Sequence, residues 1–206
     1  LGGGVVGSSA IRVALGMGAD VTVLDRSVSR LGELDEQYRG QLRTVYSTAE
    51  ALEEHVREAD LIIGAVLIPG ASAPKLITAE MLADVKPGTV MVDVAIDQGG
   101  CFETSRATTH ADPTYVVDGV VHYCVANMPG AVARTATMAL TNAALPYVTR
   151  LASDDVGSLL LEDRHFAAGL NIVHGQLTHE AVADALGQTW TEPDQILRAS
   201  LHLKSA

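Results

Sequence analysis

The chain has 206 residues, 48% of them hydrophobic, and its 25 acidic and 14 basic residues give a formal net charge of −11 at pH 7. This acidic balance excludes a nucleic-acid partner, because no basic cluster is dense enough to follow a row of phosphates. No apolar run reaches the roughly 18 residues of a membrane-spanning helix, and no charged and apolar leader opens the chain, so no membrane partner is expected.

The chain opens on a glycine-rich stretch that reads G-x-G-x-x-G through Gly2, Gly4 and Gly7. In such a stretch the first glycine permits a tight turn, the second lets the backbone approach a pyrophosphate, and the third lets a helix pack closely. A helix is predicted from Ser8 to Gly18, and its N-terminus would offer N–H groups and a positive dipole end to phosphates. The alternative is a glycine-rich tail without a function.

An apolar, β-branched strand at 19–24 follows this helix and stops at Asp25. An acid about 20 residues after the glycines accepts hydrogen bonds from the adenosine ribose, so the order of glycines, helix, strand and acid predicts a dinucleotide site. Asp25 favours NAD, whereas the adjacent Arg26 would tolerate the 2′-phosphate of NADP. A first strand should precede the glycines by about five residues. Only one residue, Leu1, precedes the glycines, so we expect the chain to begin within a fold.

Strands and helices then alternate along the chain. Predicted strands cover 44–46, 60–66, 89–94 and about 120–125, and predicted helices cover 27–38, 49–59 and 79–85. Ser27 and Thr78 are expected to cap their helices, with Leu31 and Leu34 facing inward. Continuous apolar runs are typical of strands that are buried on both faces. This alternation predicts an α/β fold with a Rossmann-type, doubly wound parallel sheet.

Ligands of such sheets bind beyond the carboxyl ends of the strands, and unusual residues gather there. Ser47 follows the third strand, and Val66-Leu67 follows the fourth. The segment from Ala95 to Gly100 follows the fifth strand, and the sixth leads into Ala126 to Pro129. We therefore expect a ligand site at this edge of the sheet.

The pattern changes at Gly130. Helices are predicted at 131–153, 159–166 and 178–186, the last with Thr178 near its N-cap, and no strand is expected after Val125. Pro146 marks a kink or boundary in the first of them. We predict a dinucleotide-binding Rossmann domain over 1–130, its first strand truncated. The helical segment 131–206 is too small for its own core, so we assign it to a second, largely absent substrate domain.

The two cysteines, Cys101 and Cys124, have no metal-ligand spacing and are too few for a disulfide framework. They are interpreted as small buried hydrophobic residues. We therefore predict no metal site and a reduced, cytoplasmic protein.

Several longer stretches carry a family resemblance, namely residues 2–7, 23–26, 64–70 with 73–76, 92–103 and 123–130. Together they resemble bacterial alanine dehydrogenase, over essentially the whole chain. The first domain of nicotinamide nucleotide transhydrogenase shares the Ile-Pro-Gly and Ala-Pro-Lys signature at 68–75. Asp97 and the Asn-Met-Pro run at 127–129 favour alanine dehydrogenase.

The resemblance implies an oxidoreductase that uses NAD to deaminate L-alanine to pyruvate and ammonia, reversibly, and that assembles as a hexamer. It implies Asp97 as the catalytic residue of this chain. The cofactor-binding residues that follow from the glycine-rich motif and the resemblance are Gly2, Gly4, Val5, Val6, Gly7, Asp25, Arg30, Ser47, Val66, Leu67, Val94, Ala95, Ile96, Asp97, Arg106, Val125, Ala126, Asn127 and Met128. The partner histidine and the lysine and arginine that hold the substrate belong, in that family, to an N-terminal domain. We therefore expect this chain alone to bind NAD without deaminating alanine.

Plainer interpretations stay open. Asp97 would also serve as a loop cap before its two glycines, and Asn127 as a turn residue. As a function, the NAD(H)-binding component of a transhydrogenase is one alternative, and a nucleotide-binding module without chemistry of its own is another.

Overall fold

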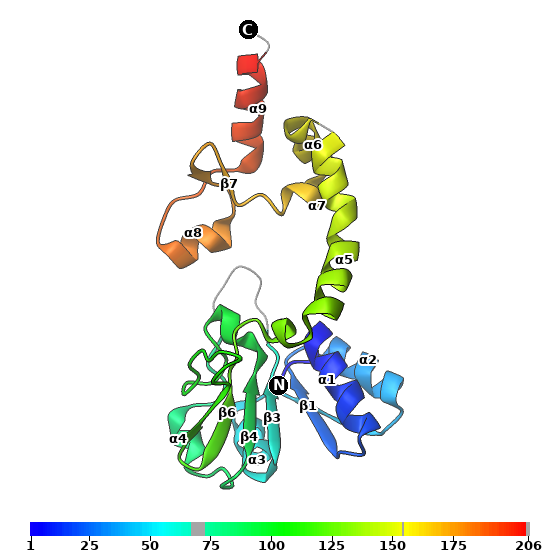
Figure 1. The fold of residues 1–206 in the computed structure, drawn as a ribbon, viewed down its shortest axis with the longest axis vertical. Helices are drawn as coiled ribbons and strands as arrows, with labels where there is room; N and C mark the ends of the chain where they lie inside the picture. The colour runs from blue at the N-terminus through cyan, green and yellow to red at the C-terminus, as the bar shows by residue number, and fades with distance from the viewer. Residues whose placement is uncertain (67–72, 154, 205–206) are drawn as a thin grey trace. The chain divides into compact units, whose positions relative to one another are not determined.

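The computed structural model describes residues 1–66, 73–153 and 155–204. The chain divides into two compact units, the first running to Met128 and the second beginning at Pro129 (Figure 1). No helix among the described residues is both long and apolar enough to cross a membrane. The assignment of residues 131–206 to a substrate domain stays a prediction.

The first unit contains a two-stranded sheet, β1-β2, and a four-stranded sheet in the order β3-β4-β6-β5. The strands are β1 (Val21–Asp25), β2 (Leu42–Tyr46), β3 (Leu61–Gly64), β4 (Val90–Asp93), β5 (Thr114–Val117) and β6 (Val120–Tyr123). All pairs are parallel except β5-β6. The predicted α/β, Rossmann-type class is confirmed. The β5-β6 hairpin was not predicted, although its Asp118-Gly119 turn, with φ of 50° and 81°, carries a strong hairpin signal.

The first two residues lie between the two sheets. The Leu1 amine donates to the carbonyl oxygen of Ile63 at 2.7 Å, and the Ala65 N–H donates to that of Leu1 at 2.8 Å. On the other side, the Gly2 N–H donates to the Leu24 carbonyl oxygen at 2.9 Å. These bonds fix the start of the glycine-rich turn between the carboxyl-terminal halves of β1 and β3.

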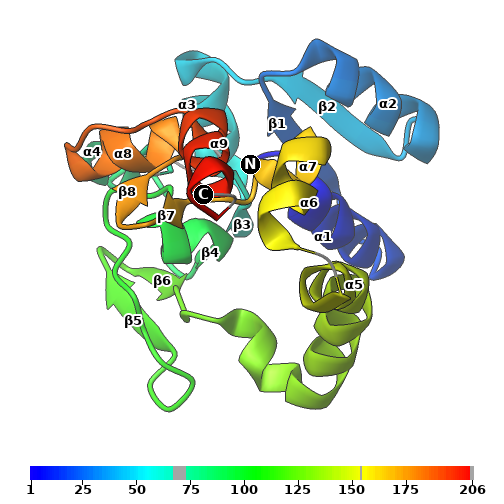
Figure 2. The same ribbon diagram turned by 90° about the horizontal axis from the view of Figure 1, so that it is seen from above.

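Among the described residues of this unit, four α-helices flank the strands, and α1 and α2 lie beside β1 and β2 (Figure 1, Figure 2). They are α1 (Val5–Gly16), α2 (Val28–Tyr38), α3 (Ala49–Glu58) and α4 (Ala79–Leu82). Both predicted caps are confirmed, because Ser27 accepts from the Arg30 N–H at 3.2 Å and Thr78 from the Met81 N–H at 3.3 Å. The helix α4 is shorter than predicted.

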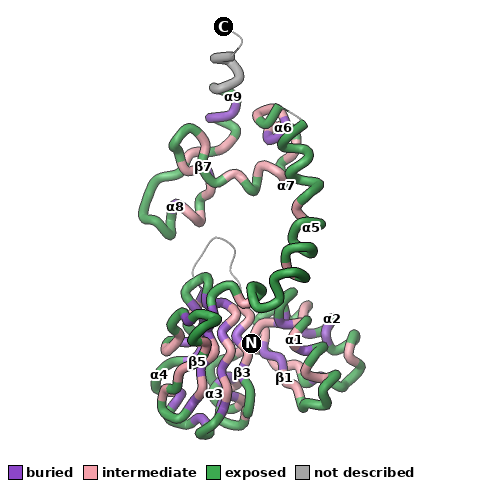
Figure 3. The backbone as a smooth tube through the Cα atoms, in the orientation of Figure 1, coloured by how far each residue is buried: buried purple, intermediate pink, exposed green. Residues whose placement is uncertain are grey.

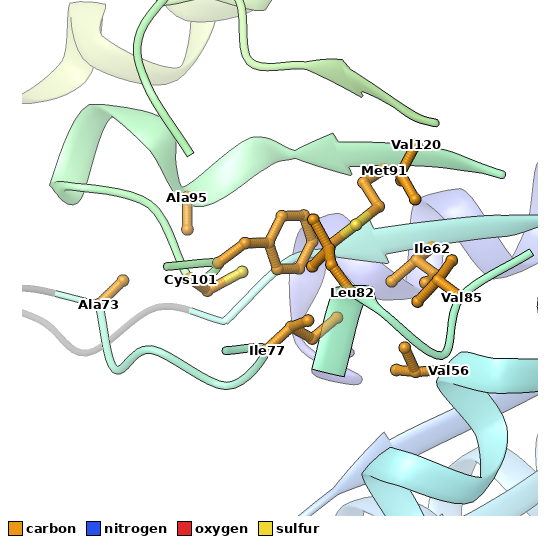
Figure 4. Close-up of a cluster of buried hydrophobic side chains, with 11 residues drawn as sticks. Val56, Ile62, Ala73, Ile77, Leu82, Val85, Met91, Ala95, Cys101 and Val120 are labelled. Carbon is orange, nitrogen blue, oxygen red and sulfur yellow. The ribbon is translucent and has the colours of Figure 1, made fainter. Parts of the chain in front are cut away.

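Two clusters of buried side chains form the core of this unit. The smaller consists of Ile11, Val23, Leu31, Leu34 and Leu42. The larger consists of Val56, Ile62, Ala73, Ile77, Leu82, Val85, Met91, Ala95, Cys101, Phe102 and Val120 (Figure 4). Cys101 thus packs as the small buried residue that was predicted, and Cys124 is buried too. The apolar pattern that predicted the strands is therefore also the pattern that fills the core.

The second unit is mainly helical. It contains α5 (Ala133–Ser153), α6 (Val156–Glu162), α7 (Arg164–Ala167), β7 (Ile172–Val173), β8 (Gln176–Leu177), α8 (Glu180–Leu186) and α9 (Pro193–Lys204), and a 3₁₀ helix, η2 (Met128–Val132), leads into it. The expectation that no strand follows Val125 is wrong, because β7 and β8 pair around a turn in which His174 and Gly175 are both left-handed. The helix α9 was not predicted.

Three local details of this unit differ from what the sequence predicts. The predicted helix over 159–166 is divided, because the Asp163 carboxylate accepts the His165 and Phe166 N–H groups and so caps a new helix. Thr178 is not a helix cap, since its hydroxyl donates to the Leu170 carbonyl oxygen at 2.9 Å. The helix α5 continues through Pro146, and none of its residues is buried (Figure 3).

We expect Leu34→Ala to lower the free energy of unfolding of the first unit by about 2–5 kcal/mol, the usual range for a buried leucine. Leu34 is 0% exposed, and the cavity would open beneath the glycine-rich turn. The control is Leu61→Ala, since Leu61 is 51% exposed. Chemical denaturation of both variants measures the difference, and equal losses would contradict the assignment of Leu34 to the core.

Candidate nucleotide-binding and catalytic site

The predicted site residues follow the carboxyl ends of parallel strands. Asp25 ends β1, Ser47 comes after β2, and Val66 comes shortly after β3. Asp97 comes after β4, and Asn127 after β6. Each of these five strands therefore delivers at least one candidate residue to the edge where ligands of such sheets bind. Leu67, also predicted, lies outside the described residues.

The three glycines of the motif differ in whether packing within the protein requires them. Gly2 has φ of +86°, and a Cβ there would lie 2.8 Å from the Ala65 carbonyl oxygen. A Cβ on Gly7 would overlap the carbonyl oxygen of Gly2. A Cβ on Gly4, in contrast, would meet no protein atom within 4 Å. Packing explains Gly2 and Gly7, while Gly4 leaves open surface at the N-terminus of α1, which has no side-chain cap.

The Asp25 carboxylate is hydrogen-bonded to the main chain of this turn. One carboxylate oxygen accepts the Gly3 N–H at 2.7 Å, and the other accepts the Ser27 N–H at 2.8 Å. Each carboxylate oxygen still has a lone pair for a further donor, such as a ribose hydroxyl. The Ser47 N–H donates to the Asp25 main-chain oxygen at 3.0 Å, which brings the ends of β1 and β2 together.

Arg30 lies against the same turn. Its Nε donates to the Gly3 carbonyl oxygen at 2.7 Å, and its Nη2 donates to the Ser8 hydroxyl at 2.6 Å. Its Nη1 pairs with Glu33 at 2.6 Å. The guanidinium is thus a support for the backbone that a nucleotide would contact. Val5 and Val6 sit at the start of α1, 88% and 47% exposed.

Asp97 lies in a 3₁₀ helix, η1 (Val94–Gln98), and is exposed. Its Oδ1 accepts the Asn127 N–H at 3.4 Å, which joins the loops after β4 and β6. Asn127 has φ of +53°, a conformation that asparagine adopts more readily than most residues. His110 Nε2 donates to the Asn127 carbonyl oxygen at 3.0 Å, so both main-chain polar groups of Asn127 are hydrogen-bonded.

The other predicted residues of these loops divide by burial. Ala95, Ile96 and Val125 have buried side chains, so only their main-chain groups remain to meet a nucleotide. Ala126 is exposed, and Val94 and Met128 are half-buried.

Arg106 lies over the face of Tyr115, with its guanidinium carbon 3.9 Å from the ring centroid. The main-chain N–H of Arg106 donates to the Tyr115 hydroxyl at 2.8 Å. The Tyr115 ring in turn stacks on His122, with centroids 4.9 Å apart. The His122 Nδ1 donates to the Val120 carbonyl oxygen at 3.1 Å, and its Nε2 accepts from the Thr104 hydroxyl at 2.8 Å. Tyr115, which is half-buried and stacked on the buried His122, therefore orients the exposed Arg106.

The buried acid that supports this region, Asp93, was not predicted as a site residue from the sequence. Asp93 is 0% exposed, and its carboxylate accepts the Cys101 N–H at 2.8 Å, the Phe102 N–H at 3.3 Å and the Ser105 hydroxyl. A signal was available, because an acid inside the apolar run 89–94 must be hydrogen-bonded to be buried.

Comparison with known proteins shows which family the chain belongs to. The family described as "Alanine dehydrogenase/PNT, C-terminal domain" matches residues 1–180. The chain belongs to this family. It is 66% identical over 197 residues to an alanine dehydrogenase of Halomonas elongata, and the match covers 96% of the chain and 53% of that relative. The chain thus spans about half the length of the curated relatives it matches.

Two solved structures distinguish the branches of the family. An L-alanine dehydrogenase aligns with a TM-score of 0.80 and 48% identity, covering 90% of this chain and 51% of that one. A transhydrogenase from Sinorhizobium meliloti aligns with a TM-score of 0.58 and 34% identity, covering 66% and 39%. This family member is therefore more similar to the dehydrogenase.

No group of three or more His, Cys, Asp or Glu side chains in the described part of the chain is arranged to hold a metal ion. The side chains of Asp25, Arg30 and Asp97 make hydrogen bonds to main-chain groups of the protein. Burial lowers the pKa of His122, and burial together with the Cys124 thiol raises the pKa of Tyr115.

We expect acid to destabilise the first unit through His122. Its pKa in the folded state lies below the unfolded value of about 6.5, so the unfolded chain binds the proton first. Stability that is present above about pH 6.5 should therefore be lost as the pH falls below it. Between about pH 7.5 and pH 5.5, the Tm of the native protein should fall more than the Tm of His122→Gln, whose side chain at this position cannot titrate. Equal falls would refute the assignment.

Proposed function

We propose that this chain is the NAD-binding part of an enzyme that deaminates L-alanine oxidatively to pyruvate and ammonia, and that also runs the reverse reaction. The main support for this proposal is that Asp97, which follows β4, is hydrogen-bonded to Asn127, which follows β6, in a chain that belongs to this family. Its relatives at 47–66% identity are named alanine dehydrogenase. The NAD-dependent dehydrogenase is favoured over the transhydrogenase component by the closer similarity of fold and sequence.

The residues at the glycine-rich turn fit a dinucleotide. The open surface over Gly4 and the uncapped start of α1 suit a pyrophosphate, since N–H groups at a helix N-terminus bind anions. Asp25 would accept the ribose hydroxyls, and Arg30 would keep the turn in shape. When bound, NAD supplies the acceptor for the hydride that leaves the substrate.

Asp97 would act on the nicotinamide half of the site. Deamination requires proton transfer as well as hydride transfer, and an exposed carboxylate can orient or exchange protons with a general base. Asn127 would donate or accept a hydrogen bond with the ribose or the carboxamide. Arg106, oriented by Tyr115, would supply positive charge near the dinucleotide.

The remaining parts of the proposal concern the whole protein. We propose that residues 131–206 belong with a substrate domain that supplies the groups binding the alanine carboxylate and amine. We also propose a cytoplasmic homo-oligomer, a hexamer. Formation of NADH by the complete gene product, with L-alanine and NAD as the only substrates, tests the reaction. NADH-dependent reduction of a second dinucleotide without alanine turnover would instead favour a transhydrogenase, and tight NAD binding without either reaction would favour a binding module.

Replacing Asp97 by Asn in the complete gene product should lower kcat by roughly 10²-fold or more, the scale on which acid–base assistance is lost. NAD affinity should change little, because the amide keeps an oxygen that can accept the Asn127 N–H. The control is Asp118→Asn in the β5-β6 turn, where asparagine also adopts positive φ. Unchanged turnover in Asp97→Asn would mean that Asp97 is only a loop cap.

The complete protein should bind NAD more tightly than NADP. A 2′-phosphate about 4 Å from the Asp25 carboxylate would meet a repulsion of roughly 4 kcal/mol per unit charge at an effective dielectric constant near 20. Asp25→Asn should narrow the preference while keeping one acceptor for the Gly3 N–H. Titration of both cofactors against both proteins measures this, and equal affinities in the native protein would refute it.

A further inference from the structure

Lys75 is the charged residue of the Ala-Pro-Lys signature, and the proposed function gives it no role. Its ammonium donates to three main-chain carbonyl oxygens, those of Gly99 at 2.6 Å, Gly100 at 2.8 Å and Phe102 at 3.1 Å. An ammonium group has three donors, so all three are used on one turn. Lys75 belongs to a segment distant in sequence, and it holds the turn that follows η1.

Asp93 contacts the same turn through other main-chain groups. The Lys75 ammonium takes carbonyl oxygens of the turn, whereas the Asp93 carboxylate takes the N–H groups of Cys101 and Phe102. Gly100 has φ of +77°, and a Cβ there would lie 2.7 Å from the Asp93 carboxylate. Within residues 99–102, the Lys75 ammonium therefore binds carbonyl oxygens and the buried Asp93 carboxylate binds N–H groups.

This turn closes the 3₁₀ helix that carries Asp97. The Gly99 N–H donates to the Ile96 carbonyl oxygen, and the Gly100 N–H to that of Ala95, both at 3.0 Å. Asp97 lies within these two hydrogen-bonded loops. Any displacement of Gly99 and Gly100 therefore moves Asp97 relative to Asn127.

Lys75 is not what holds the two segments together. The Ala73 N–H donates to the Gln98 carbonyl oxygen at 3.0 Å, and the Leu76 N–H to that of Cys101 at 2.7 Å. These main-chain bonds flank the lysine and do not depend on its side chain. Removal of the ammonium should leave the segments paired, but it leaves three carbonyl dipoles converging without a positive charge between them.

We propose that Lys75 is a positioning residue for Asp97, acting through its three bonds to the turn of residues 99–102. The proposal rests on the role of Asp97 in the proposed function. Removal of the ammonium lets the three carbonyl oxygens separate, and the 3₁₀ helix loses the geometry that sets the Asp97 carboxylate beside Asn127. Catalysis is sensitive to displacements of this size, since a misplacement of about 1 Å can cost 10²-fold in rate.

The test is Lys75→Met in the complete gene product, because methionine keeps an unbranched side chain but has no donor. Its control is Lys86→Met, which removes the same charge. The Lys86 ammonium donates to the Glu58 carbonyl oxygen at 2.6 Å and lies 3.7 Å from Asp60, among residues outside the site. We expect Lys75→Met to lower kcat by roughly 10- to 100-fold while the Kd for NAD stays nearly unchanged. Lys86→Met should match the native protein.

Hydrogen exchange without any cofactor gives a readout that does not depend on activity. In Lys75→Met the amides of residues 99–102 should exchange faster, and the core strands should exchange as in the native protein. Ethylammonium added to Lys75→Ala should restore part of the turnover by donating to the same carbonyl oxygens, and it should leave Lys86→Met unaffected.

Two outcomes overturn the proposal: native turnover and native exchange in Lys75→Met, or a loss of protection spread over the whole first unit together with loss of NAD binding. If Lys75→Met does not fold, Lys75→Gln, which keeps N–H donors but not the charge, is judged by the same exchange and turnover measurements. If the native protein fails to oxidise alanine, the proposed function fails, and the exchange experiment still shows whether Lys75 holds the turn.

Discussion

The site depends on one constraint, which is that loops leaving parallel strands must find partners for their main-chain N–H groups. Two strand-terminal aspartates meet this need in the same way. Asp25 at the end of β1 accepts the N–H groups of Gly3 and Ser27, and Asp93 at the end of β4 accepts those of Cys101 and Phe102. An unpaired N–H group buried in a loop costs about as much as a lost hydrogen bond. Each carboxylate therefore fixes the shape of the loop on which the candidate chemistry lies.

The features that were predicted from the sequence are those with a local signal. The tight turn at Gly2, the close packing at Gly7, the caps at Ser27 and Thr78 and the apolar strands follow from short-range rules, and the structure confirms them. The sequence also places Asp25 at the end of its strand and Asp97 shortly after its strand, because the alternation of elements determines where a strand ends. What each carboxylate contacts was not predictable in this way.

The missed features depend on contacts between distant segments. Lys75 meets its carbonyl partners from 24 to 27 residues away, and nothing in its own segment indicates them. The stack of Arg106, Tyr115 and His122 requires the β5-β6 register, so missing that hairpin concealed the stack. The short β7-β8 pair escaped because two-residue strands have too few positions to show alternation.

If Asp25 meets the ribose as proposed, its bond to the Gly3 N–H limits how the cofactor preference of such a site can change. A carboxylate that only met the ribose could be exchanged for a neutral or basic residue at the cost of that contact alone. Here the same group also holds the Gly3 N–H, while Arg30 holds the Gly3 carbonyl oxygen at 2.7 Å. Both polar groups of one glycine are thus bound by side chains from β1 and α2. Loss of the acid releases one of them, so acceptance of a 2′-phosphate requires a new acceptor for Gly3 as well as a new cation.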